Sequence, residues 1–328
     1  MTGGLILLDA AAVRAALPLP RALESQRLAF AALGRGEVAA SGKLLLDDSP
    51  DSTLFCYVAR LDGGSPAVCK IGSVNPGNAA AGLPAVSATV LALDPGTGRP
   101  WAVLDGTEVT TLRTAAATAL AVDLLAPRTA GVLAIVGAGV QGRQHARAIA
   151  GVRALREIRL WSPTPEHRAE AAAGLAAELA TPVRAADSVA GAVHGADLVV
   201  TCTLSSTPVL RRAWLAEHCL VASVGSFSAA RCEVDDDLVD QAGLIVVDDV
   251  PTALRNAGPV VRAGERGAGV AARLRGLGEL VLDPPATPPP GLVFFNSTGL
   301  GVQDAAAAAM VLQHLDGQGA STAASASR

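Results

Sequence analysis

Three glycines with a distinctive spacing lie near the middle of the chain, at Gly137, Gly139 and Gly142. They follow an apolar run of strand length, Gly131–Val136, and precede a run that is expected to be helical, Gln144–Ala150. Here the first glycine permits a tight turn, the second lets the backbone approach a pyrophosphate, and the third lets helix and strand pack closely. The phosphates would lie at the positive end of the helix. The pattern predicts a dinucleotide site, with an ordinary strand-to-helix turn as the alternative; its cofactor-binding residues would be Gly137, Gly139, Val140, Gln141 and Gly142.

The end of the following strand, Glu157–Trp161, indicates which dinucleotide binds. A carboxylate at this position would bind the ribose hydroxyls of NAD, whereas hydroxyl groups and a nearby cation suit the 2′-phosphate of NADP. The chain has no carboxylate there, and we expect NADP rather than NAD. The alternative is that the cation is simply a solvated helix residue. The residues concerned are Ser162, Pro163, Thr164 and Arg168.

The elements that must position this loop alternate between strands and helices from about residue 130 onward. Such alternation predicts βαβ units and a parallel sheet. The first hundred residues are richer in short strand-like runs, and an Ala-rich closing helix is expected at Asp304–Leu315. Half of the 328 residues are hydrophobic and only 3% are aromatic, as in the small aliphatic core of a parallel α/β protein.

Composition also argues against several classes of protein. The formal net charge is −4 and no basic stripe occurs, so nucleic acid is not an expected partner. The five histidines form no close pairs, which gives no support for a metal site. No signal peptide is expected, and no apolar stretch approaches the ~20 residues that span a bilayer. Five cysteines without CxxC spacing indicate reduced thiols, and we expect a cytoplasmic protein that does not bind membranes.

Several motifs together resemble the ornithine cyclodeaminase/μ-crystallin family. The resemblance covers nearly the whole chain and keeps the family's order, and the combination is more specific than any single motif. The motifs are Lys70-Ile71-Gly72-Ser73, Asn75-Pro76-Gly77-Asn78, Gly82-Leu83-Pro84, Arg113-Thr114-Ala115-Ala116, the glycine loop, and the late run 296–304 from Asn296 to Asp304.

The resemblance implies a fold and a class of reaction. Members of the family are homodimers, with a Rossmann domain inserted in a discontinuous substrate domain. We therefore expect an α/β fold: a Rossmann doubly wound parallel sheet at 119–298, plus a discontinuous α/β substrate-binding and dimerisation domain at 1–118 and 299–328. The family acts on α-amino or α-imino acids with NAD(P). Its activities include reduction of pyrroline-2-carboxylate, cyclodeamination, and an amino-acid dehydrogenase step in diaminopropionate synthesis.

The resemblance also gives three residues catalytic roles that fit their chemistry. Arg113 could hold the substrate carboxylate through two parallel hydrogen bonds. Lys70 could add a point charge and donate a proton near the imine. Asp304 belongs to the closing motif near the nicotinamide, although it could instead be an N-terminal helix cap. Without the resemblance, Lys70 and Arg113 would be interpreted as ordinary solvated charges.

Two positions depart from the family pattern. The family's second carboxylate anchor is an arginine. The nearest match here is Lys43, which could bind the substrate as a cation but not bidentately. True cyclodeaminases carry an aspartate in the segment that reads Gly225–Glu233 here, and Phe227 stands in its place. A phenyl ring cannot accept a proton, so we expect ornithine cyclodeamination to be lost or poor and open redox chemistry to remain.

Further residues complete the predicted site. Ser87 and Thr89 are expected on a strand that faces the substrate, with ordinary strand alternation as the alternative. Other hydroxyl-bearing residues are expected at the adenosine or nicotinamide ribose and in the closing motif, at Thr203, Ser205 and Ser297. The leading hypothesis is an NAD(P)H-dependent imine reductase or amino-acid dehydrogenase. The alternatives are a cyclodeaminase with tightly bound NAD and a non-catalytic μ-crystallin-like binding protein; which amino or imino acid is the substrate, and the direction of the reaction, stay open.

Overall fold

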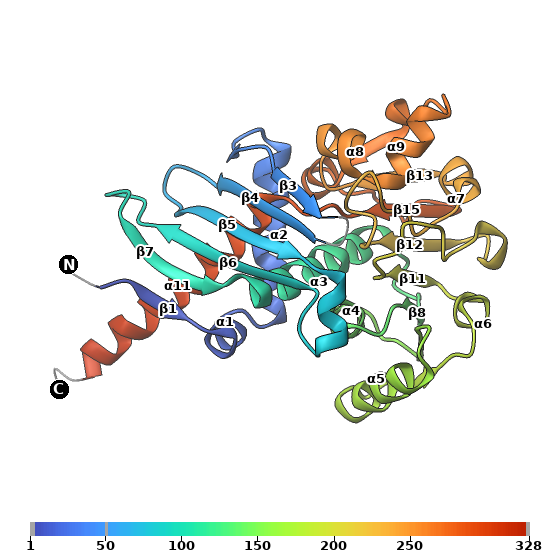
Figure 1. The fold of residues 1–328 in the computed structure, drawn as a ribbon, viewed down its shortest axis with the longest axis horizontal. Coiled ribbons are helices and arrows are strands. Elements are labelled where there is room, and N and C mark those ends of the chain that lie inside the picture. The colour runs from blue at the N-terminus through green and yellow to red at the C-terminus, as the bar shows by residue number, and fades with distance from the viewer. Residues whose placement is uncertain (1–3, 50–51, 326–328) are drawn as a thin grey trace. The chain divides into compact units, whose positions relative to one another are not determined.

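A computed structural model of the chain describes residues 4–49 and 52–325, and these form two compact units. Unit 1 contains residues 1–113 and 300–328, and unit 2 contains residues 114–299. The divisions fall at residues 113/114 and 299/300, where the sequence led us to expect 118/119 and 298/299. Figure 1 traces the chain through both units, and each is described here by itself.

Unit 1 contains a mostly antiparallel sheet. Its strands are ordered β1-β7-β6-β5-β4-β2, with β3 also pairing with β4. The β1–β7 pair is parallel and the other pairs among the described residues are antiparallel. Strands β6 and β7 form an antiparallel hairpin. The strands are β1 (Ile6–Leu8), β2 (Ala39–Ala40), β3 (Leu44–Ser49), β4 (Ser52–Arg60), β5 (Ala67–Val74), β6 (Val86–Leu93) and β7 (Pro100–Asp105).

The closing helix α11 (Gly301–Ser325) packs across one face of this sheet, on β4 and β5 (Figure 1). Helix α2 (Leu19–Gly34) packs on α11, and α1 (Ala10–Ala16) packs on β7. A side chain at Gly301 would come within 2.8 Å of the Tyr57 ring, so glycine permits the close approach of α11 to β4. The expected helix Asp304–Leu315 was too short, because both flanks continue in residues compatible with a helix.

Unit 2 contains the predicted parallel sheet, and this prediction is confirmed. All its strand pairs are parallel, in the order β10-β9-β8-β11-β12-β15-β13-β14. The strand order reverses between β8 and β11, and ligands of doubly wound sheets bind beyond the carboxyl ends at such a point. The strands are β8 (Val132–Val136), β9 (Glu157–Trp161), β10 (Val183–Ala185), β11 (Leu198–Thr201), β12 (Cys219–Ser223), β13 (Leu244–Val247), β14 (Leu274–Gly276) and β15 (Leu292–Asn296).

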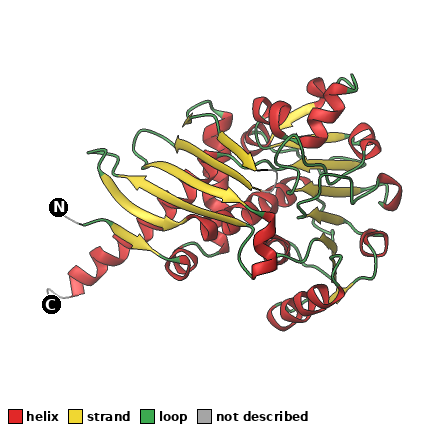
Figure 2. Ribbon diagram, in the orientation of Figure 1, coloured by secondary structure: helices red, strands yellow, loops and turns green. Residues whose placement is uncertain are grey.

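Helices connect the strands of unit 2, as Figure 2 shows. The central strands are buried on both faces: Val221 and Phe294 lie in one apolar cluster, while Ala222 and Phe295 are as deeply buried on the other face. This is the burial that covered parallel sheets require. The helices are the later part of α3 (Gly106–Leu125), α4 (Val140–Ala150), α5 (Pro165–Glu178), α6 (Val189–Val193), α7 (Asp236–Gln241), α8 (Val250–Asn256), α9 (Gly258–Glu265) and α10 (Leu277–Leu282).

Among the described residues, no helix combines the length and apolar character that crossing a bilayer requires.

Candidate active site

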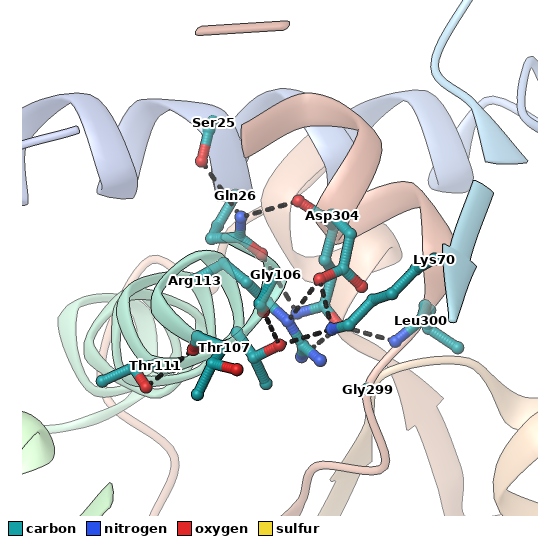
Figure 3. Close-up of polar contacts among 12 residues, drawn as sticks. Ser25, Gln26, Lys70, Gly106, Thr107, Thr111, Arg113, Gly299, Leu300 and Asp304 are labelled. Carbon is teal, nitrogen blue, oxygen red and sulfur yellow. Dashed lines mark hydrogen bonds and ion pairs between the residues drawn. The ribbon is translucent and has the colours of Figure 1, made fainter. Parts of the chain in front are cut away.

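Three ionic side chains from distant parts of the sequence meet in the interior of unit 1. Lys70 lies on β5, Arg113 on α3 and Asp304 in the first turn of α11. The ammonium Nζ of Lys70 lies 2.7 Å from Oδ1 of Asp304, and Nε of Arg113 lies 3.4 Å from the same oxygen. Figure 3 shows both cations pointing toward this carboxylate. The structure thus brings together the three residues that the sequence singled out as catalytic.

Strand alternation explains why the lysine faces inward. In a strand, successive side chains point to opposite faces of the sheet. Lys70 pairs with Tyr57 on β4 and with Val90 on β6, and all three are buried on the α11 side. Its neighbour Ile71 points the other way and is 60% exposed. The alternative interpretation, an ordinary solvated lysine, is therefore wrong, because the side chain of Lys70 is 1% exposed.

Tyr57 belongs to this cluster, although sequence reasoning missed it. Its hydroxyl donates a hydrogen bond of 2.5 Å to Oδ2 of Asp304, the oxygen that Lys70 does not contact. The ammonium of Lys70 lies 5.8 Å from the centre of the Tyr57 ring. Only the pairing of β4 with β5 places Tyr57 opposite Lys70, so the register of this hairpin was the one signal that could have found it.

Asp304 is not the N-cap of its helix, because α11 begins three residues earlier at Gly301. A carboxylate in the first helical turn is stabilised by the helix dipole. Burial by itself would raise the pKa of Asp304, but the charges of Arg113 and Lys70, with the hydrogen bonds that it accepts, lower it below the usual value. The carboxyl group is therefore ionised.

The ammonium group of Lys70 has a pKa close to neutrality. Burial lowers it from 10.5 to about 8, the negative charge of Asp304 opposes this shift, and the positive charge of Arg113 adds to it. Burial also raises the pKa of Tyr57 well above 10, and the Asp304 charge adds to that increase, so the phenol is neutral. At neutral pH the cluster contains two cations and one anion, with one proton of Lys70 available for transfer.

A buried chain of amides holds Arg113 in place. Its Nη1 donates to Oε1 of Gln303 at 3.2 Å, and Gln303 donates in turn to Oε1 of Gln26 at 3.0 Å. Gln26 donates to the hydroxyl of Ser25 on the same helix, α2 (Figure 3). These amides were not singled out from the sequence. A fixed guanidinium is the state in which bidentate recognition of a carboxylate loses least entropy.

Of the residues predicted to bind the substrate, Lys43 lies near the cluster, whereas Ser87 and Thr89 do not. The charge of Lys43, next to the start of β3, contributes to the lowered pKa of Lys70, so this cation lies within electrostatic reach of the cluster. Ser87 and Thr89 are exposed on β6 and pair with Ser73 and Ile71. By strand alternation they lie on the face of the sheet opposite Lys70. The structure does not bring them together with the cluster.

The glycine loop of unit 2 has the geometry that a dinucleotide requires. Gly137 has a φ of +119°, and a side chain there would lie 2.7 Å from the carbonyl oxygen of Cys202. A side chain at Gly142 would overlap the carbonyl oxygen of Gly137. At Gly139, by contrast, the space beside Cα is open. Gly139 caps α4 without a side-chain hydrogen bond, which leaves the first backbone N–H groups for an anion. The loop therefore fits a pyrophosphate.

Helix α4 begins at Val140, four residues earlier than expected. The glycine spacing had suggested a longer loop, but Val140 and Gln141 already form the first turn. Val140 is 54% exposed there, and the side-chain oxygen of Gln141 is buried with no hydrogen-bond partner among the described residues. The shorter loop places the helix N-terminus directly beside the open space at Gly139.

The end of β9 lies next to the glycine loop, because β8 and β9 are parallel neighbours. Ser162 is buried, and its hydroxyl donates to the carbonyl oxygen of Thr164 at 3.3 Å. Arg168 donates to the carbonyl oxygen of Ser162 at 3.1 Å and lies 3.5 Å from Asp187. Arg168 therefore stabilises this loop, and part of its guanidinium is already hydrogen-bonded within it.

The other cofactor candidates follow strands at the same edge of the sheet. Thr203, after β11, donates from both its backbone N–H and its hydroxyl to Oε1 of Glu233. Ser297, after β15, donates to Asp248 at 3.1 Å. Ser205 donates to the carbonyl oxygen of Thr207 at 2.6 Å. Parallel strands end at one edge, so these residues lie along the expected binding edge, but their hydroxyls serve the loops themselves.

Glu233 is the residue that organises this edge, and sequence reasoning did not single it out. It is fully buried, and its second oxygen accepts from Thr201, Ser223 and the backbone N–H of Gly225. Burial raises its pKa, and the neutral donors around it oppose that shift only in part. Glu233 thus ties the ends of β11 and β12 together.

Phe227 is half-buried on the loop after β12. The guanidinium of Arg231 lies 5.2 Å from the centre of its ring, within the range of a cation–π interaction. The aromatic side chain therefore has a structural partner in its own loop and offers no acid–base group.

No group of three or more histidine, cysteine, aspartate or glutamate side chains suited to a metal occurs among the residues that the structure describes.

The doubly wound sheet, its glycine loop and the separate cationic cluster define a nicotinamide-dependent oxidoreductase. The model of the ornithine cyclodeaminase/mu-crystallin family matches residues 9–319, and the chain belongs to this family. The resemblance found in the motifs is confirmed.

Known members show how closely the chain follows the family. It is 34% identical over 315 residues to Delta(1)-pyrroline-2-carboxylate reductase 2 of Burkholderia ambifaria, covering 94% of this chain and 95% of the relative. It is similar to the solved structure of Thermococcus litoralis Delta(1)-pyrroline-2-carboxylate reductase in complex with NADH and L-proline, with a TM-score of 0.91 and 25% identity over 96% and 98% of the two chains. An archaeal alanine dehydrogenase dimer with bound NAD gives a TM-score of 0.87 and 26% identity over 96% and 97%.

Proposed function

We propose that this chain reduces a cyclic α-imino acid, such as pyrroline-2-carboxylate, to the corresponding amino acid with NADPH. In this proposal unit 1 binds the substrate and unit 2 binds the cofactor. The observation that carries it is the buried cluster of Lys70, Arg113 and Asp304. The similarity to two pyrroline-2-carboxylate reductases supports the choice of substrate.

The charge of the cluster suits a substrate with one carboxylate. Lys70 and Arg113 carry two positive charges and Asp304 carries one negative charge, while the phenol of Tyr57 is neutral. One positive charge is in excess, and Lys43 adds another nearby. A buried excess of positive charge is costly unless an anion neutralises it. The substrate carboxylate would supply that anion, and the planar guanidinium of Arg113 would orient it.

The proton chemistry of Lys70 fits reduction of an imine. A dinucleotide held with its pyrophosphate on the glycine loop would supply the hydride for the imine carbon. The imine nitrogen must gain one proton in the same turnover. Lys70 is protonated at neutral pH, and its lowered pKa of about 8 makes proton transfer easier than from an ordinary lysine. Asp304 holds the ammonium in place and favours its charged form.

Phe227 argues against the closed cycle of a cyclodeaminase. That cycle needs an acid–base group for the substrate amine, and Phe227 with its partner Arg231 provides a ring and a permanent cation instead. We therefore propose an open reaction in which each turnover consumes one reduced cofactor.

The direct test is a screen of cofactor absorbance with pyrroline-2-carboxylate, piperideine-2-carboxylate, and pyruvate with amines. We expect a cyclic imine to be reduced with one NADPH consumed per product. Arg113→Lys keeps the positive charge but removes the two parallel N–H donors of the guanidinium. It should raise KM by ~10- to 100-fold with a smaller change in kcat. Conversion of ornithine to proline without net cofactor change would overturn the proposal in favour of cyclodeamination. A melting-temperature shift with NADPH but no turnover of any imine would favour a binding protein.

We further propose that the chain is a homodimer that associates through the outer face of the sheet in unit 1. Apolar side chains that alternate with the buried ones are exposed there, as strand register predicts. A solved dimer with a TM-score of 0.87 supports a second copy as the occupant. Exposed apolar patches of this kind mark interaction sites. The face includes Leu7 (74% exposed), Leu44 (70%), Leu46 (65%), Ile71 (60%) and Val58 (47%).

Molecular mass in solution tests the homodimer. Ile71→Lys should convert dimer to monomer in light scattering, because it places a charge in the centre of the proposed interface. Leu282→Lys, at a leucine of unit 2 that is 45% exposed, is the matched control and should leave the mass unchanged. A wild-type monomer, or a dimer that persists in Ile71→Lys, would contradict this interface.

The five free thiols are consistent with the cytoplasm, which we propose as the location of the protein.

A further inference from the structure

A cavity of about 320 Å³ opens beside the glycine loop in unit 2. Its lining includes Gly139, Ser162 and Thr164, and also Arg143, His167 and Glu170, which the sequence analysis did not name. All of these belong to the loops after β8 and β9 and to the helices that follow them. The cavity therefore lies where the adenosine ribose of a dinucleotide on the glycine loop would be expected.

The backbone fixes Arg143 at this cavity. Helix α4 starts immediately after Gly139, and the backbone N–H of Arg143 closes its first turn on the Gly139 carbonyl oxygen at 3.1 Å. Helical side chains lean back toward the N-terminus, which fits the place of Arg143 in the lining of this cavity. The backbone N–H of Gly137 donates to the carbonyl oxygen of Trp161 at 2.7 Å, which holds the two loops together.

Two arginines could supply the cation for a phosphate, and the structure distinguishes them. Arg168 already donates to the Ser162 carbonyl oxygen and lies 3.5 Å from Asp187. Among the residues that the structure describes, Arg143 makes neither a hydrogen bond nor an ion pair through its guanidinium. Its charge reaches Glu178, but that carboxylate is already bound by Arg147 at 2.6 Å. Arg143 is thus the cation of the cavity that is available to a ligand.

We infer that Arg143 selects NADP(H) over NAD(H) by binding the 2′-phosphate of the adenosine ribose. The hydroxyls of Ser162 and Thr164 and the His167 ring line the same cavity and offer further donors. Glu170 also lines it and acts in the opposite direction, because its carboxylate repels a phosphate and can accept from a ribose hydroxyl. The preference is therefore set by the balance between Arg143 and Glu170. The inference rests on the proposed function only in that a nicotinamide dinucleotide occupies the glycine loop.

Calorimetric titration of the full chain with NADP⁺ and with NAD⁺, without substrate, tests this inference. Arg143→Gln should raise the Kd for NADP⁺ by ~10- to 100-fold, as expected for a lost charge-assisted hydrogen bond, and leave the Kd for NAD⁺ nearly unchanged. Arg275→Gln, at an exposed arginine of β14 that pairs with Glu279, is the control and should change neither value. Glu170→Gln should shift the ratio further toward NADP⁺.

Equal weakening of both dinucleotides by Arg143→Gln would overturn the inference, as would a wild-type chain that binds NAD⁺ as tightly as NADP⁺. Failure of the proposed function has a different signature. If Arg143→Gln reverses the dinucleotide preference while no imine is reduced, the inference stands and the proposed substrate is wrong. If imines are reduced but the preference does not respond to Arg143→Gln, only the inference fails.

Discussion

Asp304 in unit 1 and Glu233 in unit 2 are fully buried carboxylates, each held by several hydrogen bonds, and the two differ in the charge of their partners. Asp304 in unit 1 is held by two cations and a phenol, and its pKa is lowered. Glu233 in unit 2 is held by hydroxyls and backbone N–H groups, and its pKa is raised. The first arrangement builds a charged site that can act on a substrate. The second arrangement holds the ends of β11 and β12 together, and its neutral donors add no charged group that could act on a substrate.

The largest effect is expected from Asp304→Asn. The change leaves Lys70 and Arg113 buried together without a counter-charge, which should lower the free energy of unfolding by ~3–5 kcal/mol. Denaturant unfolding measures this loss, and Asp283→Asn, at an exposed position, is the control with an expected change below ~0.5 kcal/mol. An Asp304→Asn protein of wild-type stability would show that the cations do not depend on this carboxylate.

Lys70→Met should reduce kcat for the imine by ~10²- to 10⁴-fold, the usual contribution of a positioned general acid. Methionine keeps an unbranched side chain of similar length in the buried site. In the wild type, the rate of imine reduction should fall as pH rises through about 8, because Lys70 then loses its proton. The reverse oxidation should gain over the same range. A reductive rate that does not change with pH around 8 would exclude Lys70 as the acid.

Lys43→Met sharpens this test. The charge of Lys43 lowers the pKa of Lys70, so its removal should move the alkaline limb of the pH profile upward while kcat on the plateau changes little. If the limb stays in place, it belongs to another group.

Glu233→Gln should cost about 2–3 kcal/mol of stability, because the new amide cannot accept from both Thr203 and Gly225 backbone donors. The pH dependence has the opposite sign to that of Asp304. The pKa of Glu233 is higher in the folded than in the unfolded chain, where it is ~4.3. Glu233 therefore makes its full contribution to stability below pH ~4.3, and this contribution is lost as pH rises through the folded pKa. Asp304 stabilises above ~3.9, and its contribution is lost as pH falls through its folded pKa. When the free energy of unfolding is measured across acid pH, the part of its pH dependence that comes from Glu233 should be absent in Glu233→Gln.

The smallest effect is expected from Tyr57→Phe, which removes one donor to Asp304 but leaves both cations. We expect a loss of about 1.5 kcal/mol, at the low end for a hydrogen bond to a charged group. Val90→Ala, at another buried position paired with Lys70, serves as a packing control, since it should lower stability without changing the pH profile. If Tyr57→Phe lost more stability than Asp304→Asn, the hydrogen bond from the phenol would matter more to the cluster than the charge of Asp304, contrary to our proposal.

The sequence alone determined the parallel sheet, the glycine loop, and the importance of Lys70, Arg113 and Asp304. Strand and helix periodicity are local, and the glycine spacing has a direct steric cause in the close contacts at Gly137 and Gly142. The family's motifs marked the ionic residues without showing how they meet. Local patterns also explain why the start of α4 and the end of α11 were misjudged, because helix ends carry weaker signals than helix interiors.

Tertiary structure alone decided which side chains share a face and which groups are paired. The register of β4 with β5 places Tyr57 beside Lys70, and the alternation of β6 turns Ser87 and Thr89 to the opposite face. The role of Glu233 can be recognised only from the pairing of β11 with β12. The place of Arg143 can be recognised only from the cavity beside the loops that follow β8 and β9. Contacts between residues tens or hundreds of positions apart depend on strand register and packing, and neither is encoded in the spacing of a local motif.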